Sequence, residues 1–526
     1  MMLSKDQRLK LTEICCRIKL NRPVTLEERI WVNKLCQHNK HAAGNRRENN
    51  IMRLLSINIG PDSSAALLED GEITSYLSAE RVSRKKHDSD IFEILEYLPE
   101  IDDLNYSDII VNDMSYDDEV LLRVEKFIAD KFKFKRIDFN RNDGRLPQAY
   151  CGFFNSPFNK ALCFVSNEGV YRANRKSIKE IYQSDTFERT TFSLGPKFGL
   201  LAKKFGFEYE DASKIVDLSQ WFGYEVGLDP KWREMVDESV DLQEESENEM
   251  IELIRKHYKE TGIDNIVLTG DYASNHVANS KIKKEFPELN FFIDPLRSVS
   301  IGEAYKYYKK NSFFRKKIKP LKNVYIGTPL QYDQLKTKYS SYQVLFGTVY
   351  EDMLGTIARI MTQGIPVAIA QGQSEGGFKS LGNRSIVFDP RAERGWEQIS
   401  KIEQDREEFV PFGASILQDT VKEWFEFEGE SPFMEYVAKG KPDWNTDLFH
   451  YGRCCIHTVT KEQNYHYYRL LQEFYECSNI PMLVNIPLCT SDEPIAETLD
   501  QVIESLLKLG VTYLYLPERE CIVRVR

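Results

Sequence analysis

The stretch LLSINIGPDSSAALLEDGEITSYL, from Leu54 to Leu77, sets the fold expected for the first large part of the chain. Leu54–Ile59 and Ala65–Leu68 are apolar runs typical of strands, and the Gly-Pro-Asp between them is typical of a turn. Glu-Asp-Gly then has the composition of a hairpin turn and leads into a third strand, Ile73–Leu77. The stretch therefore predicts three successive strands at the start of a sheet.

Strands and helices continue to alternate after this opening. Further strands are expected at Asp108–Val111, Ala161–Val165, Asn265–Leu268 and Asn290–Ile293, with helical patterns between them. Alternation of this kind predicts an α/β fold. The run Asp237–Glu252 is rich in carboxylates, and we interpret it as an exposed face of a helix or loop rather than as a metal site.

A second α/β unit follows a polar and basic stretch at residues 303–345. Its helices are expected at Met353–Met361, Asp419–Glu428, Tyr465–Tyr475 and Glu497–Lys508, and its strands at Val367–Gln371, Met482–Ile486 and Thr512–Leu516. Residues 1–50 are interpreted as a short helical extension. A helix is expected to begin near Thr25, and a polar linker follows it. The predicted domains are therefore 1–50, 51–335 and 336–526.

Composition excludes several classes of protein. A chain of 526 residues with 42% hydrophobic residues is long enough for two or three cores. The net charge of −11 argues against a surface built throughout for nucleic acid, although it allows a local basic groove. The ten cysteines show neither zinc spacing nor a disulfide framework, and we expect buried thiols. With no apolar run of about 18 residues and no signal peptide, a cytoplasmic protein without a membrane partner is expected.

The segment AQGQSEGGFKSLGNRSIVFDPR, residues 370–391, carries the strongest chemical signal. A strand leads into glycines whose backbone can approach a ligand, and Lys379, Asn383, Arg384 and Ser385 follow. Such donors suit phosphate oxygens. A glycine-rich turn before a surface helix would look the same from composition alone.

The same segment resembles the pattern Gly-Arg-Met-Glu-Phe-Gly-Pro-Arg-Ala-Leu-Gly-Asn-Arg-Ser-Ile of the O-carbamoyltransferases related to nodulation protein U and to antibiotic carbamoylating enzymes. Other blocks resemble the family in the same order along residues 52–526. They are residues 58–71, 79–88, 152–158, 268–279, 409–412 and 485–495.

The resemblance implies a fold and an activity. The first domain would have the duplicated, ribonuclease-H-like fold of actin and acetate kinase, and the second would be YrdC-like. Such an enzyme makes carbamoyl adenylate from ATP and carbamoyl phosphate, with Mg²⁺ accompanying ATP, and transfers the carbamoyl group to a hydroxyl. Adenylate is a good leaving group, and cationic donors stabilise charge that develops on phosphoryl oxygens.

Site residues follow from the matched blocks. We expect catalytic roles for Lys379 and Arg384 in the second domain. Nucleotide contacts are expected from Gly372, Glu375, Gly376, Asn383, Ser385, Arg391 and Asn485. Contacts to the acceptor are expected from Gly60, Ser63, Ser64, Arg81, Arg84, Lys214, Gly270, Asn275, Asn279, Lys309 and Lys310.

The chain departs from the family at its metal site. Members of the family hold an iron-type ion through two histidines and two aspartates, and here the matching stretches offer Gly144, Gln148, Asn167 and Leu296. Neutral amides are poor replacements for imidazole and carboxylate toward a transition metal. We therefore predict that the first domain binds no metal.

Two residues are candidates for the base that activates the acceptor hydroxyl. His87 has an ordinary pKa suited to proton removal near neutrality, although a histidine at a helix end can simply hold backbone. Asp62 lies at a strand-to-turn point, where it could equally cap the turn.

The acceptor is approached through the segment Tyr305–Lys319, which interleaves cations with aromatic residues. That mixture suits a phosphate backbone with stacked or extruded bases, and phage members of the family are thought to act on hydroxymethylated pyrimidines in DNA. We therefore expect 5-hydroxymethylcytosine in DNA as the acceptor, with a small hydroxylated metabolite, sugar or antibiotic as the alternative. A buried aromatic stripe on a solvated helix would give the same pattern. A homodimer is possible, and a nucleotide- or DNA-binding protein without transfer activity is the remaining alternative.

Overall fold

A computed structural model gives the fold of most of the chain. It describes residues 52–525 apart from 61–62, 167, 185–195, 224–227, 312–316, 334, 336–337, 340–341, 347–352, 393–394, 396–406, 408 and 442–452. The predicted N-terminal helix and the candidate base Asp62 therefore lie outside the described residues.

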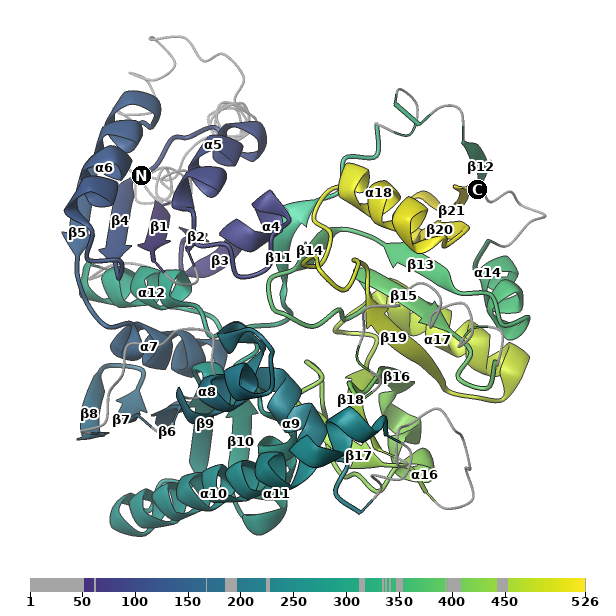
Figure 1. Cartoon of the computed structure of the whole chain (residues 1–526). Helices are drawn as coiled ribbons and strands as arrows, with labels where there is room; N and C mark the ends of the chain where they lie inside the picture. The colour runs from purple at the N-terminus through teal and green to yellow at the C-terminus, as the bar shows by residue number, and fades with distance from the viewer. Residues whose placement is uncertain are drawn as a thin grey trace, which may run out of the picture.

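The first sheet follows directly from the opening stretch. Its strands are β1 (Arg53–Ile59), β2 (Ser64–Glu69), β3 (Glu72–Ser78), β4 (Asp108–Asp113) and β5 (Arg136–Asn140), in the order β3-β2-β1-β4-β5. β1 is antiparallel to β2 and parallel to β4. The central β1 is buried at six of its seven positions, which explains its almost continuous apolar sequence. Helices α4 (Ala79–Ser83), α5 (Ile91–Ile101) and α6 (Asp118–Lys131) complete this half (Figure 1).

The second sheet repeats the topology of the first. Its strands are β6 (Lys160–Val165), β7 (Gly169–Asn174), β8 (Ile178–Gln183), β9 (Asn265–Thr269) and β10 (Asn290–Ile293). They lie in the order β8-β7-β6-β9-β10, so that the third, second, first, fourth and fifth strands follow one another in both sheets. The pairing directions are the same as well. This repetition confirms the predicted duplicated, actin-like fold of the first domain.

Two helices join the halves of this domain. α7 (Arg145–Asn155) and α12 (Val299–Asn311) pack against each other between the two sheets (Figure 1). Their close approach depends on Gly302, because a Cβ atom there would overlap the carbonyl oxygen of Pro147. The carboxylate-rich run lies on α10 (Pro230–Thr261), so it forms a helix rather than a loop.

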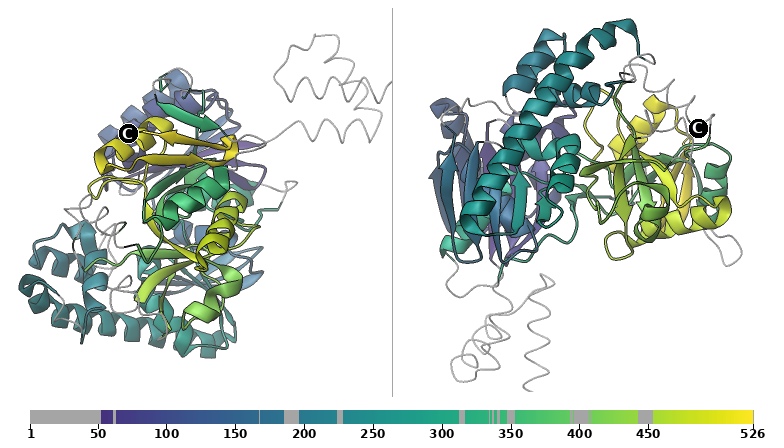
Figure 2. Two further views of the ribbon diagram at one scale, coloured as in Figure 1. Left: turned by 90° about the vertical axis from the view of Figure 1, so that its right-hand side faces the viewer. Right: turned by 90° about the horizontal axis from the view of Figure 1, so that it is seen from below.

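A helical insertion separates β8 from β9. It consists of α8 (Pro196–Lys204), a 3₁₀ turn at Tyr209–Ala212, α9 (Ser213–Ser219) and α10, and α11 (His276–Glu285) follows β9. Seen from below, the insertion extends from the first domain towards the second (Figure 2). α11 contacts β17 (Tyr436–Lys439) of the second domain, so this half of the first domain lies directly against the second domain.

The second domain is built on a mixed sheet of nine strands. Its order is β12-β21-β20-β13-β15-β19-β16-β18-β17. The bounds are β12 (Gln343–Phe346), β13 (Val367–Ala370), β15 (Arg384–Phe388), β16 (Gly413–Leu417), β17 (Tyr436–Lys439), β18 (Arg453–Val459), β19 (Met482–Pro487), β20 (Tyr513–Leu516) and β21 (Cys521–Arg524). The predicted α/β class is confirmed for this domain too, while its YrdC-like relationship stays a prediction.

Helices cover both faces of this sheet. α14 (Met353–Thr362) and α17 (Tyr465–Ser478) pack into one hydrophobic cluster, and α18 (Leu499–Leu509) packs into another. α18 begins where Thr498 and Gln501 form a capping box. The helix expected at Asp419–Glu428 is wrong in extent, because α16 covers only Val421–Trp424. Phe425 is buried and bridges to Gly440, so a tertiary contact ends the helix early.

A short pair of strands lies where the domains meet. β11 (Tyr325–Pro329) pairs with β14 (Gln373–Glu375) and contacts β3 of the first domain. The Gln373 side chain donates a hydrogen bond to the carbonyl oxygen of Thr74. β11 thus precedes the predicted boundary at residue 335 although its partner strand follows it, and the boundary itself stays a prediction. Within the described ranges, no helix combines the length and apolar character needed to cross a bilayer.

Candidate functional site

A cavity of about 410 Å³ lies between the two domains. Its first-domain wall comes from the loop after α4, from α9, from the start of α11 and from the loop after β10. Its second-domain wall comes from the loop after β14 and from β19. The ionisable or amide side chains that line it include His87, Glu210, Asp217, Asp271, His276, Asp294, Arg297, Lys379, Glu435 and Asn485.

The glycine-rich loop presents Lys379 to this cavity. One carboxylate oxygen of the buried Glu375 accepts hydrogen bonds from the backbone N–H groups of Leu381 (2.7 Å) and Asn383 (2.9 Å). Ser380 next to Lys379 is held by Asn485, whose amide donates to the Ser380 carbonyl oxygen at 2.9 Å. The loop is therefore fixed directly after Lys379, and such support favours a precise side-chain position.

The glycines of the loop permit a close approach of the domains. A Cβ atom at Gly377 would lie 2.8 Å from the carbonyl oxygen of Pro295 in the first domain. A Cβ atom at Gly376 would lie 2.8 Å from Ile326. The predicted nucleotide-contact residue Gly376 thus serves packing here.

The catalytic role predicted for Arg384 is wrong as a phosphate contact. Its guanidinium is fully buried and donates to the backbone carbonyl oxygens of five residues. They are Gln371, Asn383, Thr328, Gly372 and Glu497. These bonds occupy its N–H groups and leave none directed at the cavity, so Arg384 holds the surrounding loops together.

Most other residues predicted to contact the nucleotide also form hydrogen bonds within or around the glycine-rich loop. The Gly372 N–H donates to Glu518, and the Ser385 hydroxyl accepts from the Gly382 N–H. Asn383 donates to the Gln373 carbonyl oxygen at 2.7 Å. Arg391 is paired with Asp389 and lies outside the cavity wall. Of the residues predicted in this domain, Lys379 and Asn485 line the cavity.

His87 is the predicted base that reaches the cavity. It follows α4 with a left-handed backbone (φ 60°), and its N–H donates to Glu80 at 3.2 Å. The neighbouring hydroxyls are used elsewhere, since Ser63 donates to the Ser89 carbonyl oxygen and Ser64 bonds Ser300. Gly60 lies in the same turn, where its N–H donates to Ser63.

Three cations predicted to contact the acceptor are instead engaged in ion pairs. Arg81 pairs with Glu497 and Arg84 with Glu493, both in the second domain. Lys214 pairs with Asp211 and with Glu407 at 2.6 Å. Carboxylates of the protein therefore neutralise these cations, and their contact with a substrate stays a prediction.

In the block from Gly270 to Asn279, the predicted residues support the backbone and the domain interface. Gly270 has φ 75°, which favours glycine, and Asn275 caps α11 by accepting from the Ala278 N–H. Asn279 donates across the domain interface to the carbonyl oxygen of Glu435 at 3.2 Å. The residues of this block that line the cavity are Asp271, Ala273, Ser274 and His276.

Sequence reasoning missed His276 and its neighbour Asp217. The His276 Nε2 atom lies 3.6 Å from an Asp217 carboxylate oxygen. Burial, with a smaller contribution from the positive charge of Lys379, lowers the pKa of His276 to about 3. The ring is therefore neutral near pH 7 and offers hydrogen bonds rather than charge. His276 could have been found from its position inside the matched block 268–279, whereas no local motif marks Asp217.

Glu435 is a second residue that the sequence did not indicate. It lies just before β17, and its carboxylate accepts hydrogen bonds from the Phe433 N–H (2.8 Å) and the Ser431 hydroxyl (3.2 Å). Burial outweighs these bonds and the nearby Lys283, and raises the pKa of Glu435 to about 7. A carboxyl group of this kind can exchange a proton near neutrality.

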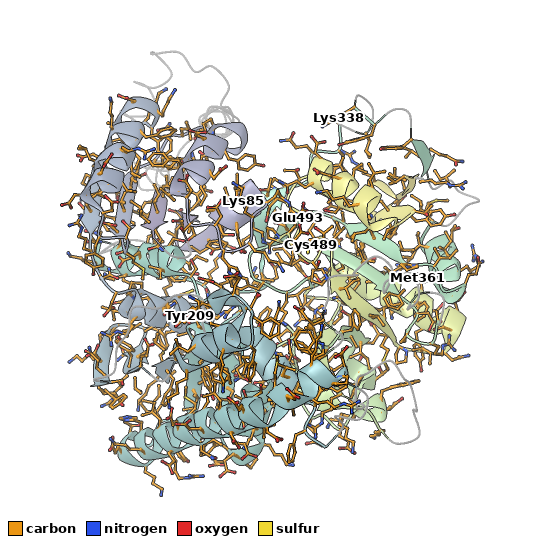
Figure 3. All side chains as sticks on the ribbon, in the orientation of Figure 1. Lys85, Tyr209, Lys338, Met361, Cys489 and Glu493 are labelled. Atoms are coloured by element: carbon orange, nitrogen blue, oxygen red, sulfur yellow. The ribbon has the colours of Figure 1, made fainter. Side chains whose placement is uncertain are left out.

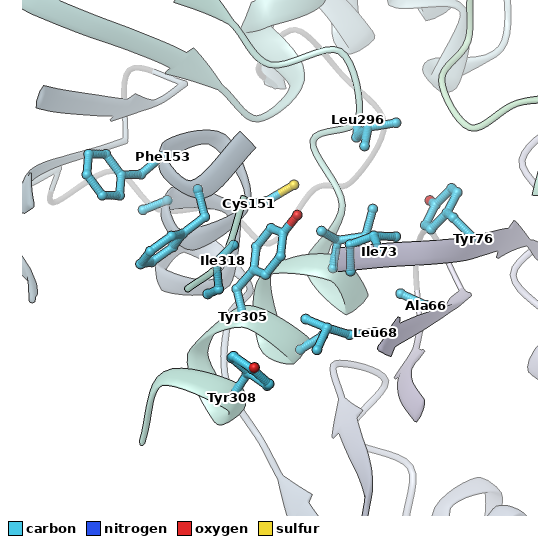
Figure 4. Packing of buried hydrophobic residues seen from close by; sticks show 14 of the residues in the cluster. Ala66, Leu68, Ile73, Tyr76, Cys151, Phe153, Leu296, Tyr305, Tyr308 and Ile318 are labelled. Carbon is cyan, nitrogen blue, oxygen red and sulfur yellow. The ribbon is translucent and has the colours of Figure 1, made fainter. Parts of the chain in front are cut away.

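The described part of the basic aromatic segment, residues 305–311 and 317–319, does not line the cavity. Tyr305, Tyr307 and Tyr308 are at most 5% exposed, and they pack on α12 in the core between the two sheets (Figure 4). Rings that are buried in this way cannot stack on bases, so the interpretation as a stacking surface is wrong for them. Lys309 and Lys310 end α12 and do not line the cavity.

The residues at the family's metal position do not fit a transition metal. Gly144 caps α7 and has no side chain, Gln148 donates to the carbonyl oxygen of Arg297, and Leu296 is buried in the hydrophobic core. The described ranges contain no group of three or more His, Cys, Asp or Glu side chains arranged for a metal ion. The absence of a metal from the first domain stays a prediction.

Comparisons with known proteins show which proteins the chain is similar to. The model described as "Carbamoyltransferase C-terminus" matches residues 358–523, and a domain of unknown function (DUF8638) matches residues 2–103. Nodulation protein NolNO of Sinorhizobium fredii is 25% identical over 85% of this chain and 76% of its own length. An uncharacterized Synechocystis protein is 28% identical over 54% of this chain, which spans about half (51%) of that relative.

A solved structure, full-length HypF in a phosphate- and nucleotide-bound form, is 13% identical over 34% of this chain and 22% of its own, with a TM-score of 0.24. That overlap is too small to bear on the fold, which rests on the sheet topology above. The matched C-terminal region includes the loop that presents Lys379 to the cavity. This match and the similarity to nodulation proteins support a relationship to the O-carbamoyltransferases.

Proposed function

We propose that this chain makes carbamoyl adenylate from ATP and carbamoyl phosphate and transfers the carbamoyl group to a hydroxyl. The observation that carries the proposal is the cavity of about 410 Å³, which is lined both by the Lys379 loop and by His87 of the actin-like domain. An activated intermediate and its acceptor can share one chamber of this size, which lies within the range of small-molecule sites.

The chemistry balances without a metal from the protein. Hydrolysis of carbamoyl phosphate yields carbamate and phosphate, and the carbamate oxygen attacks the α-phosphorus of ATP with loss of pyrophosphate. Lys379 would stabilise the charge that develops on the phosphoryl oxygens, with the loop held by Asn485 and Glu375. The acceptor hydroxyl then attacks the carbamoyl carbon, and AMP leaves.

The acceptor hydroxyl must lose its proton in the second step. His87 lines the chamber and is the base that we propose, with Asp62 as the alternative from the same segment. Glu435 faces the same space and could carry the proton onward, because its carboxyl group titrates near neutrality.

We propose a small hydroxylated molecule as the acceptor. The chamber wall carries Glu210, Asp217 and Asp271, and carboxylates can accept hydrogen bonds from the hydroxyl groups of a small molecule. The buried tyrosines of α12 also remove the stacking surface on which a DNA acceptor was expected. A 5-hydroxymethylcytosine base, extruded into the chamber, is therefore the second candidate.

Mass spectrometry of the products separates these acceptors. The chain is incubated with ATP and carbamoyl phosphate, together with either free amino sugars and hexoses or DNA that contains 5-hydroxymethylcytosine. A gain of one carbamoyl group on a small molecule supports the proposal, and the same gain on the hydroxymethylated base alone replaces it with the DNA acceptor. Pyrophosphate release without any carbamoylated product would leave only the first half-reaction. Failure of both would leave a nucleotide- or DNA-binding protein.

A further inference from the structure

The segment that carries His87 is fastened to the second domain by cations. Arg84 donates to the Ile495 carbonyl oxygen at 2.8 Å and to Glu493 at 3.0 Å. Lys86 donates to the Ser491 carbonyl oxygen. Lys85 and Glu493 mark this junction, where α4 meets the second domain (Figure 3).

Arg81 makes the deepest of these contacts. Its side chain is 6% exposed and donates to the Ile495 carbonyl oxygen at 3.1 Å and to the Glu497 carboxylate at 3.3 Å. Its other terminal nitrogen donates to the carbonyl oxygens of Glu375 (3.2 Å) and Gly377 (2.6 Å). A residue of the first domain therefore holds the start of the loop that presents Lys379.

The two sides of the loop are held by different domains. Glu375, from the same domain, binds the backbone at Leu381 and Asn383, after Lys379. Arg81 binds the backbone at Gly377, before Lys379. On the leading side, the Gly376 N–H also donates to the Val324 carbonyl oxygen at 2.7 Å. Arg81 adds the side-chain contacts there, at the carbonyl oxygens of Glu375 and Gly377.

Arg81 also fills the seam between the domains. A pocket of only about 20 Å³ remains there, lined by Arg81, Glu80 and Gly376 among others. This pocket shares Tyr76, Gly377 and Phe378 with the large chamber, so the two spaces adjoin. Its volume is about that of one water position, and removal of the Arg81 side chain would widen it.

We propose that Arg81, with Arg84 beside it, is a positioning residue that seals this seam and retains carbamoyl adenylate in the chamber until a hydroxyl accepts the carbamoyl group. The inference rests on the proposed function. Escape of the intermediate matters because water then hydrolyses it to carbamate and AMP, and ATP is consumed without product.

The test needs no knowledge of the acceptor. Wild-type chain, Arg81→Ala, Arg81→Lys and Arg84→Ala are mixed with ATP and carbamoyl phosphate alone, and AMP and pyrophosphate are followed through the first turnover and beyond. The wild-type chain is expected to give a burst of about one equivalent and then slow release. Arg81→Ala should keep the burst and raise steady AMP release about tenfold, with a smaller rise for Arg81→Lys, because the lost charge-assisted bonds open the seam.

Arg53→Ala is the matched control, because Arg53 also bridges several carboxylates but does so within the first domain. It should destabilise that domain without raising steady AMP release. If Arg81→Ala does not fold, Arg84→Ala decides, and a raised steady rate supports the inference. Steady release at the wild-type rate in the folded Arg81 and Arg84 variants, or rapid multiple turnover by the wild-type chain, would overturn it. A wild-type chain that releases no pyrophosphate at all would instead refute the proposed function.

Discussion

Lys379 is the side chain on which the first half-reaction depends in this account. It lies half-buried between two fixed points of its loop and lines the chamber. Lys379→Ala should lower pyrophosphate release from ATP and carbamoyl phosphate by about 100-fold or more, since a preorganised charge is lost from the transition state. Its melting temperature should stay close to that of the wild-type chain. Lys422→Ala, at an exposed site on α16, is the control, and equal rates in both variants would contradict the role.

Arg384 should behave in the opposite way, as a stability residue. Arg384→Ala removes a buried guanidinium and leaves several carbonyl oxygens without donors. We expect the free energy of unfolding to fall by about 3–5 kcal/mol in urea titrations. A variant with wild-type stability and no pyrophosphate release would restore the catalytic role that the sequence indicated.

Glu435 gives the stability of the protein a pH dependence. Below pH 4.5, its carboxyl group is protonated in both the unfolded and the folded chain and contributes no difference. As the pH rises from 4.5 to about 7, the unfolded chain releases its proton first, so the free energy of unfolding falls, and above about pH 7 the full cost remains.

Glu435→Gln removes this titration. The variant should be more stable than the wild-type chain at pH 8 by about 1–3 kcal/mol, with a difference that vanishes towards pH 4. Denaturant titrations across this range measure it. A stability difference that does not vary with pH would show that the carboxyl group titrates normally.

At the scale of elements, α12 carries both buried tyrosines and the lysines that were expected to bind DNA. Its tyrosines form core between two sheets, and its last turn carries Lys309 and Lys310. Lys309→Gln together with Lys310→Gln should leave both half-reactions with a small acceptor unchanged, because neither side chain lines the chamber. If DNA is bound there, the slope of log K against log salt should instead decrease by about 0.9 for each lost phosphate contact. Salt titrations of DNA binding decide between the two outcomes.

The elements also show what the sequence could and could not predict. Strands such as β6 and β9 were visible because a buried strand is a short, continuous apolar run. α16 ended early because Phe425 is drawn into a tertiary contact that no local pattern records. Basic and aromatic alternation on α12 was ambiguous for the same reason, since only the fold decides which face of a helix is buried.

At the scale of the whole molecule, the candidate site is an assembly of distant segments. Lys379, His87 and Asn485 were predicted from the matched motifs, and all three line the same chamber. The motifs could not distinguish residues that contact a ligand from residues that hold the backbone. Arginine is a residue type that binds phosphate, but Arg384 and Arg81 donate to backbone carbonyl oxygens of the protein. Asp217 and Glu435 had no motif, and their place in the chamber follows from how the helical insertion and β17 pack.

The central claim is that one chamber both makes and consumes carbamoyl adenylate. Its most direct test is rapid-quench mass spectrometry of the wild-type chain mixed with ATP and carbamoyl phosphate in the absence of acceptor. The account predicts about one equivalent of carbamoyl adenylate per chain, formed together with pyrophosphate and absent from Lys379→Ala. Formation of ADP in place of AMP and pyrophosphate, or the same amount of carbamoyl adenylate in Lys379→Ala, would contradict it.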